Sequence, residues 1–187
     1  DLDLSDAVAV VHDWGGPIGL RCAVEQPERF SAMVAMDTGL FTGEQRMSDA
    51  WQTFRAFVER TEDLPISMLV RNAVARGMSD EVAAAYDAPF PVAESKAGAR
   101  AFPLMLPTDP GMPGAAAGKR VLEALRRDER PKLCLWADSD PIIPPAVGAR
   151  FAEAIGAEPP RVIADASHFL QEDAGPEIGA AIADWLS

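Results

Sequence analysis

Short apolar runs alternate with longer amphipathic segments at both ends of this chain. Four of these runs have the length of buried strands, at residues 7–11, 31–36, 133–137 and 161–164. A helix is predicted between the first two runs, over residues 17–26, because Pro17 suits a first helical turn and Pro27 stops a helix. A strand, a helix and a second strand at this spacing form a βαβ unit, so we expect an α/β fold with a parallel sheet.

The middle of the chain has a different pattern. From about residue 40 to 118 the apolar positions follow helical spacing, with breaks at proline and glycine. Ser48 is predicted to cap a helix that has Trp51 on its apolar face, and Ser79 to cap another. A further amphipathic stretch covers residues 64–76. An all-helical insertion of this kind between strands is typical of a lid.

The βα pattern then returns, with helices expected at residues 119–127, 146–155 and 176–186. We therefore divide the chain into a first part of an α/β core (1–40), a helical cap (41–118) and the C-terminal part of the core (119–187). Four strands are fewer than the five or six of a typical sheet. The sheet is accordingly expected to lack strands on its N-terminal side.

Charge and composition exclude several classes of function. The net charge of −12, without a cluster of Lys and Arg, argues against binding to nucleic acid or to an anionic membrane surface. The longest apolar stretches are too short to cross a bilayer, no signal peptide opens the chain, and two cysteines far apart in sequence suit a reducing cytosol, so a cytoplasmic protein is expected. Cys22 and Cys134 lie in apolar segments and are predicted to be buried free thiols. There are only two histidines, no CxxC pair and no phosphate-binding glycine loop, so neither a metal nor a cofactor is predicted.

Three polar residues follow three of the predicted strands. The segment His12-Asp13-Trp14-Gly15-Gly16 places a carboxylate where a strand turns sharply into a helix, as many hydrolases place their nucleophile. Asp140 and His168 follow the third and fourth strands. Since the carboxyl ends of parallel strands form one edge, all three can converge there. Taken singly, Asp13 would cap a helix, Asp140 would start an Asp-Pro turn and His168 would be a surface histidine.

The three residue types suit one reaction. A carboxylate displaces a leaving group from saturated carbon and leaves an alkyl ester on Asp13. His168 would then draw a proton from the water that hydrolyses the ester, and Asp140 would orient the imidazole ring. The backbone N–H of Trp14 would hold the oxyanion, together with one N–H from a loop early in the fold. An indole N–H donates without bringing a charge, which suits a departing anion.

These and other segments resemble one family. The matching segments are residues 11–16, Ala50-Trp51, and residues 85–91, 97–103, 138–141 and 164–172. The chain resembles an α/β-hydrolase, and within that superfamily a haloalkane dehalogenase with an Asp-His-Asp triad. The resemblance implies cofactor-free hydrolysis of a small apolar halogenated substrate, with the released halide held by Trp14 and Trp51. Trp51 also fits the apolar face of its own helix.

Some positions depart from the family pattern. Asp37, after the second strand, stands where a related subfamily keeps its triad acid, although Asp140 in Asp-x-Asp-Pro matches this subfamily better. The family's early strands and its His-Gly-x-Pro loop are not found. The expected pocket walls are apolar side chains that would equally suit a protein core, namely Phe102, Pro103, Leu106, Ile142, Ile143 and Phe169.

Other functions stay open. An epoxide hydrolase uses the same Asp and His but needs a pair of tyrosines in its cap, and this chain has one, Tyr86. A fluoroacetate-type dehalogenase would need cationic residues beside the nucleophile, and the nearest, Arg21, is expected to face away. A third alternative is a catalytically incompetent fragment that acts by association through its open sheet edge.

Overall fold

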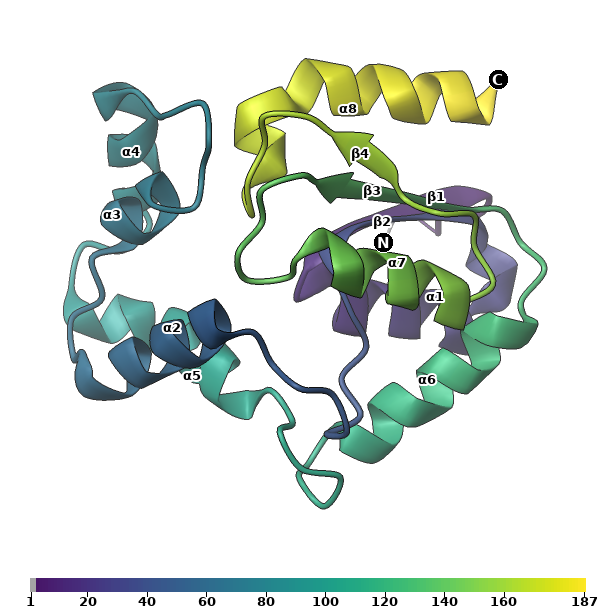
Figure 1. Ribbon diagram of the computed structural model, residues 1–187, viewed down its shortest axis with the longest axis horizontal. Helices are drawn as coiled ribbons and strands as arrows, with labels where there is room; N and C mark the ends of the chain where they lie inside the picture. The colour runs from purple at the N-terminus through teal and green to yellow at the C-terminus, as the bar shows by residue number, and fades with distance from the viewer. Residues whose placement is uncertain (1–2) are drawn as a thin grey trace.

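A four-stranded parallel sheet lies at the centre of the computed structural model, which describes residues 3–187 (Figure 1). Its strands are adjacent in chain order: β1 (Ala7–Asp13), β2 (Phe30–Thr38), β3 (Lys132–Ala137) and β4 (Arg161–Ile163). Each strand overlaps one of the predicted apolar runs, and the prediction of a parallel α/β sheet is confirmed. Because all four strands run the same way, their carboxyl ends share one edge.

The alternation of side chains along β2 and β3 separates two apolar layers. Met33 and Ala35 of β2 join one cluster with Trp136 of β3, and Val34 joins the other with Leu135. Both strands are apolar on both faces because helices cover both faces.

Helices pack on the two sides of the sheet (Figure 1). The first layer holds the π-helical turn η1 (Gly16–Leu20), α1 (Arg21–Glu25), α6 (Ala115–Arg127) and α7 (Pro145–Ala154). A short turn, η2 (Pro27–Arg29), leads into β2. The other layer is α8 (Leu170–Leu186), which contains the predicted closing helix and begins six residues earlier, with a break in helical geometry at Ala174.

The segment between β2 and β3 contains the helices α2 (Asp49–Arg60), α3 (Ile66–Arg71), α4 (Asp80–Asp87), η3 (Ala93–Lys96) and α5 (Ala97–Met105). We call this group, residues 49–105, the helical insertion. Ser48 and Ser79 accept the predicted capping hydrogen bonds, from the N–H groups of Trp51 and Val82. The insertion lies beyond the end of the sheet to which β3 and β4 point (Figure 1).

The helical insertion has an apolar cluster of its own. Val58, Leu64 and Ile66 are buried in it, and aromatic side chains from α2 and α4 pack around them. The amphipathic stretch at residues 64–76 forms a shorter helix than expected, because only Ile66–Arg71 is helical. The boundaries of the three predicted domains remain predictions.

One prediction about the cysteines is wrong. Cys134 is buried in β3, and its burial raises the pKa of the thiol to about 12. Cys22 is exposed, because α1 turns this side chain away from the sheet. Among residues 3–187, no helix is both long and apolar enough to span a bilayer.

Candidate active site

The turn after β1 presents Asp13 at the carboxyl edge of the sheet. Asp13 has a left-handed backbone conformation with φ of 46°, which is strained for a residue other than glycine. The hydroxyl of Thr38 on β2 donates to the Asp13 carbonyl and braces the turn. Gly16 fits beneath, because a Cβ at that position would overlap the Thr38 hydroxyl. The Asp13 side chain is 43% exposed, so it stays open to a small molecule.

His168 lies between two of the predicted carboxylates. Its Nδ1 is 2.8 Å from Oδ2 of Asp140, and its Nε2 is 3.8 Å from Oδ1 of Asp13. An Nδ1–H that donates to Asp140 leaves Nε2 free to accept a proton on the side of Asp13. Burial alone would lower the pKa of His168, but the hydrogen bond to Asp140 and the nearby carboxylates outweigh it and leave that pKa raised.

The Asp140 carboxylate is held by backbone groups of its own loop. Its Oδ1 accepts hydrogen bonds from the N–H groups of Ile142 and Ile143, at 2.7 and 3.0 Å, while its Oδ2 faces His168. The side chain has no exposed surface. Three donors on one buried carboxylate stabilise its charge, and the predicted contact between Asp140 and His168 is present in the structure.

His12 supports the histidine loop from β1. Its Nε2–H donates to the carbonyl of His168 at 2.7 Å, and the two rings lie 5.1 Å apart. Burial, followed by the charge on His168, lowers the pKa of His12 and keeps its ring neutral. No sequence pattern had assigned this role to His12.

Asp37 lies beside the same cluster. Its carboxyl has no exposed surface, and its Oδ1 accepts the N–H of Ala137 at 3.0 Å. One oxygen each from Asp37 and Asp140 and one ring nitrogen of His168 all lie within 4.8 Å of one another. Within residues 3–187, this trio is the one group of side chains compact enough to consider as a metal site. Nδ1 of His168, however, is already hydrogen-bonded to Asp140. Burial, followed by the charge on Asp140, raises the pKa of Asp37 to about 8.

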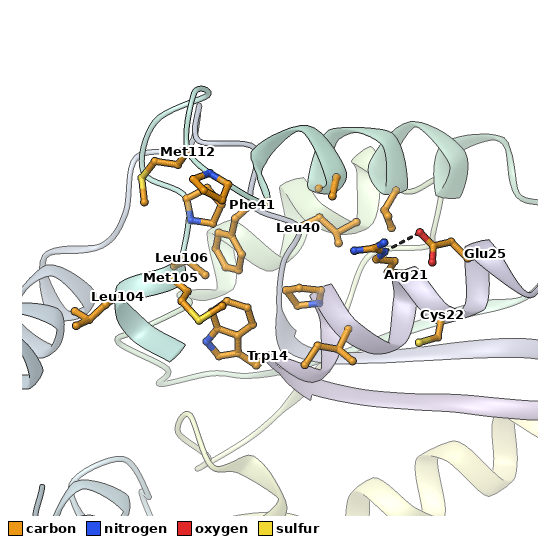
Figure 2. A pocket seen from close by; sticks show the side chains of 18 residues that line it. Trp14, Arg21, Cys22, Glu25, Leu40, Phe41, Leu104, Met105, Leu106 and Met112 are labelled. Carbon is orange, nitrogen blue, oxygen red and sulfur yellow. Dashed lines mark hydrogen bonds and ion pairs between the residues drawn. The ribbon is translucent and has the colours of Figure 1, made fainter. Parts of the chain in front are cut away.

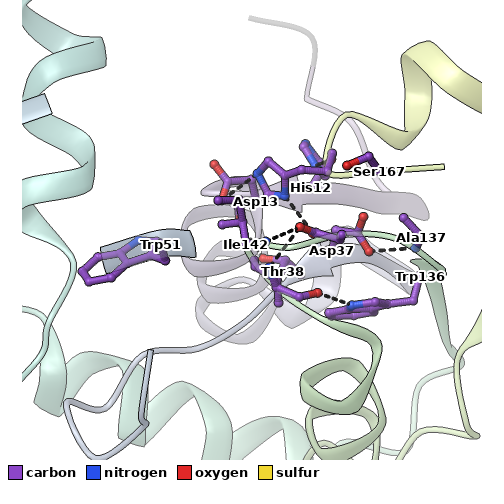
Figure 3. Close-up of polar contacts among 12 residues, drawn as sticks. His12, Asp13, Asp37, Thr38, Trp51, Trp136, Ala137, Ile142 and Ser167 are labelled. Carbon is purple, nitrogen blue, oxygen red and sulfur yellow. Dashed lines mark hydrogen bonds and ion pairs between the residues drawn. The ribbon is translucent and has the colours of Figure 1, made fainter. Parts of the chain in front are cut away.

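The two tryptophans predicted to bind halide belong to different elements. Trp14, half-buried in the turn after β1, packs edge-on against Phe102 of α5 with ring centroids 4.9 Å apart. Trp51 is buried on α2, with the guanidinium of Arg55 over its ring. In Figure 3, Trp51 approaches from the side of the cluster where Asp13 lies.

The six predicted pocket residues do not line a single cavity. Trp14 and Leu106 line a cavity of about 700 Å³, in which Met105 lies next to the indole (Figure 2). Ile142 and Ile143 line a second cavity of about 460 Å³. The other three residues line neither cavity: Phe102 packs on Trp14, Pro103 is buried in α5, and Phe169 packs against His168 and Tyr86.

Comparison with known proteins matches residues 1–175 to the alpha/beta hydrolase fold family. The match includes Asp13, Asp140 and His168. The chain belongs to this family. Its sheet, its strained turn at Asp13 and its buried acid–histidine pair are thus the features of an α/β hydrolase.

Several relatives of this hydrolase have a named activity. A haloalkane dehalogenase of Mycolicibacterium paratuberculosis (strain ATCC BAA-968 / K-10) is 41% identical over 185 residues, and one of Mycobacterium marinum (strain ATCC BAA-535 / M) is 37% identical over 186. These alignments cover 98% and 99% of this chain, but 62% and 63% of the relatives. The chain therefore spans somewhat less than two thirds of the length of the curated relatives it matches.

Solved structures agree with the fold. The tetrameric haloalkane dehalogenase DpaA from Paraglaciecola agarilytica NO2 superposes with a TM-score of 0.86 at 31% identity, over 96% of this chain and 60% of that one. An ancestral haloalkane dehalogenase, AncHLD2, gives a TM-score of 0.78 at 25% identity, over 98% of this chain and 69% of that one.

One buried group of this α/β hydrolase was missed by sequence reasoning. The carboxylate of Asp173, on α8, accepts the backbone N–H of Ser167 at 2.9 Å, and those of Ala75 and Arg76 at distances down to 2.9 and 2.7 Å. The N–H of Phe169 donates to the carbonyl of Ala73 at 3.0 Å. The histidine loop is thus bonded to the helical insertion, and no local pattern indicates a contact between segments almost 100 residues apart.

Proposed function

We propose that the protein containing this chain hydrolyses haloalkanes to an alcohol and a halide ion. The main support is the arrangement of Asp13, His168 and Asp140, in which an accessible carboxylate faces Nε2 of a histidine whose Nδ1 is bonded to a buried acid. The similarity to haloalkane dehalogenases over almost the whole chain supports the same activity.

In the first step of the proposed reaction, an oxygen of Asp13 attacks the carbon that bears the halogen. A carbon–oxygen bond forms, the carbon–halogen bond breaks, and the halide leaves with the bonding electrons. The half-exposed side chain at the strained turn is free to approach the substrate, because its backbone is braced from below by Thr38 and Gly16.

In the second step, water attacks the carboxyl carbon of the ester. Nε2 of His168 takes a proton from this water, and Asp140 stabilises the imidazolium that results. The ester then collapses, releases the alcohol and restores the Asp13 carboxylate. Over both steps, haloalkane and water become alcohol, halide and a proton.

The helical insertion is proposed to act as the cap of this site. The indole N–H groups of Trp14 and Trp51 would donate to the departing halide, and the backbone N–H of Trp14 to the oxyanion. Phe102 packed on Trp14 would hold one indole in place. The six apolar residues of the expected pocket remain proposed substrate contacts.

The nucleophile is tested by halide release and by mass. Asp13→Ala should abolish halide release from short 1-haloalkanes, whereas Asp184→Ala, at an exposed position on α8, should leave it unchanged. His168→Gln should stop the reaction after the first step, and the peptide containing Asp13 should then gain the mass of the alkyl group. Halide release that survives in Asp13→Ala, in the full-length protein, would exclude this mechanism.

The halide site is tested separately by tryptophan fluorescence. Bromide should quench the wild-type protein, and Trp51→Phe should remove most of that quenching. Trp185→Phe is the matched control, because Trp185 packs against the apolar cluster between α8 and the sheet. Equal quenching in Trp51→Phe and wild type would exclude Trp51 from the halide site.

A further inference from the structure

Two carboxyl groups meet without solvent at the end of β2 and β3. Neither Asp37 nor Asp140 has exposed side-chain surface, and one oxygen of each lies within 4.8 Å of the other and of a ring nitrogen of His168. Two neighbouring carboxylates in a dry site repel each other strongly, so one of the pair retains its proton.

The hydrogen bonds show which carboxyl is ionised. Asp140 accepts three donors, the N–H groups of Ile142 and Ile143 and Nδ1 of His168. Asp37 accepts one, from Ala137, and its Oδ2 is buried without a hydrogen-bond partner. Asp140, which accepts more hydrogen bonds, is therefore the anion, and the unpaired oxygen of Asp37 is the place for the proton.

We propose that Asp37 holds a proton at neutral pH and donates it in a hydrogen bond to the Asp140 carboxylate, as a positioning residue for the Asp140–His168 pair. Oδ2 of Asp37 changes from an unpaired acceptor into a donor, so the buried orphan is removed. The titratable groups nearest to it are Asp140 from the β3–α7 loop and His168 from the β4–α8 loop, and His12 and Asp13 in turn lie near His168. This role in catalysis rests on the proposed function, but the protonation of Asp37 does not.

Protonation is tested by stability, without any assay of activity. Asp37→Asn keeps an acceptor for Ala137 and a permanent donor for Asp140, but it has no proton to lose. The pKa of Asp37 is about 8 in the folded protein, against its ordinary value of 3.8 in the unfolded chain. Between these two pH values the folded wild type holds a proton that the unfolded chain has released. Wild-type stability from this group is thus full below pH 3.8 and is lost as pH rises towards 8.

The folding constant of Asp37→Asn relative to wild type should therefore rise with pH, by up to about tenfold per unit between pH 5 and 8. Urea unfolding at several pH values measures this ratio, and Asp184→Asn controls for the loss of one acidic group. A ratio for Asp37→Asn that stays flat over this range would overturn the proposal. In the Asp140→Asn background the rise should shrink, because the charge that favours the protonated form of Asp37 is gone.

The positioning role is tested by halide release at pH 7. Asp37→Ala, which lacks the donor, should lower kcat by about tenfold, the equivalent of one hydrogen bond to a charged group. Asp37→Asn should restore most of the wild-type kcat. Equal loss of kcat in both variants, or no loss in Asp37→Ala, would overturn the positioning role of this donor. If no form of the full-length protein releases halide, the proposed function fails while the stability ratio still decides the protonation of Asp37.

Discussion

Asp140 and Asp173 are both buried carboxylates with three donor groups, but Asp140 bonds the His168 side chain, whereas Asp173 bonds the backbone of the loop that carries it. Asp140 bonds the imidazole ring and two N–H groups of its own loop. Asp173 bonds the backbone N–H of Ser167, next to the histidine, and two N–H groups of the helical insertion. One region sets the direction of a ring and the other sets the position of a loop.

Burial and hydrogen bonding alone therefore do not mark a catalytic acid. An acid that touches the imidazole can stabilise its charge during proton transfer, whereas one that touches only amides can stabilise only the fold. Variants at the two positions should accordingly separate rate from stability.

The largest expected effect is on rate, at Asp140. Asp140→Asn keeps an acceptor for Ile142 and Ile143 but offers a donor to Nδ1, which favours the wrong tautomer of His168. We expect kcat for halide release to fall by on the order of 10⁴-fold, with a change in unfolding free energy below about 1 kcal/mol. Steady-state kinetics and urea unfolding measure the two quantities. A large loss of stability with a modest loss of kcat would contradict the division of roles.

The next effect is on stability, at Asp173. Asp173→Ala leaves the three backbone N–H groups of Ser167, Ala75 and Arg76 without their acceptor, which should lower the unfolding free energy by about 3 kcal/mol. The folded fraction should keep most of its kcat, because the ring of His168 still meets Asp140. If Asp173→Ala lost kcat as severely as Asp140→Asn while its urea midpoint stayed at the wild-type value, Asp173 would serve the reaction rather than the fold.

A smaller effect, on stability, is expected at His12, which donates to the carbonyl of His168. The lowered pKa of His12 means that the unfolded chain binds a proton before the folded chain does, so this residue's contribution to stability is full above pH 6.5 and is lost as pH falls below it. His12→Gln keeps a donor for the His168 carbonyl without this titration. The folding constant of wild type relative to His12→Gln should fall between pH 7 and 5, by less than about tenfold per unit. A ratio that rises towards acid pH would show that His12 is charged when folded.

The smallest effect is expected at Arg76. Its guanidinium donates to the carbonyls of Ala164 and Asp165 and pairs with Glu177 at 2.8 Å, but it is exposed to water. Arg76→Ala should lower the urea midpoint by well under half of the shift caused by Asp173→Ala, and added salt should shrink the difference from wild type. A loss as large as that of Asp173→Ala would mean that the side chain, rather than the buried carboxylate, joins the insertion to the histidine loop.

Local sequence patterns predicted the parts of the molecule that local physics determines. The apolar runs located all four strands, and the capping serines marked the starts of α2 and α4. The turn at Asp13 followed from the glycines behind a buried strand. That Asp140 and His168 lie together followed from one rule of parallel sheets, that the strands end at a common edge.

Contacts between distant loops were beyond such patterns. Asp173 bonds Ala75 across 98 positions, and Asp37 bonds Ala137 across 100. In the sequence, Asp173 is an ordinary acidic residue in the first turn of a helix, and Asp37 only a second candidate for the triad acid. Their partners are backbone N–H groups, which every residue offers, so residue type does not identify the pair. The expected pocket walls likewise depended on distant contacts: Leu106 lines one cavity, Ile142 and Ile143 line another, and the other three residues line neither.

The bond between His12 and the carbonyl of His168 spans 156 positions. A chain under synthesis therefore has the turn at Asp13, and even its helical insertion, long before His168 emerges. Until β4 and the loop after it emerge and dock, the amides of Ala75 and Arg76 have no Asp173 to meet and the Asp13 carboxylate has no imidazole. Because of the order of translation, the candidate site is therefore complete only when the last long-range contacts of the fold form.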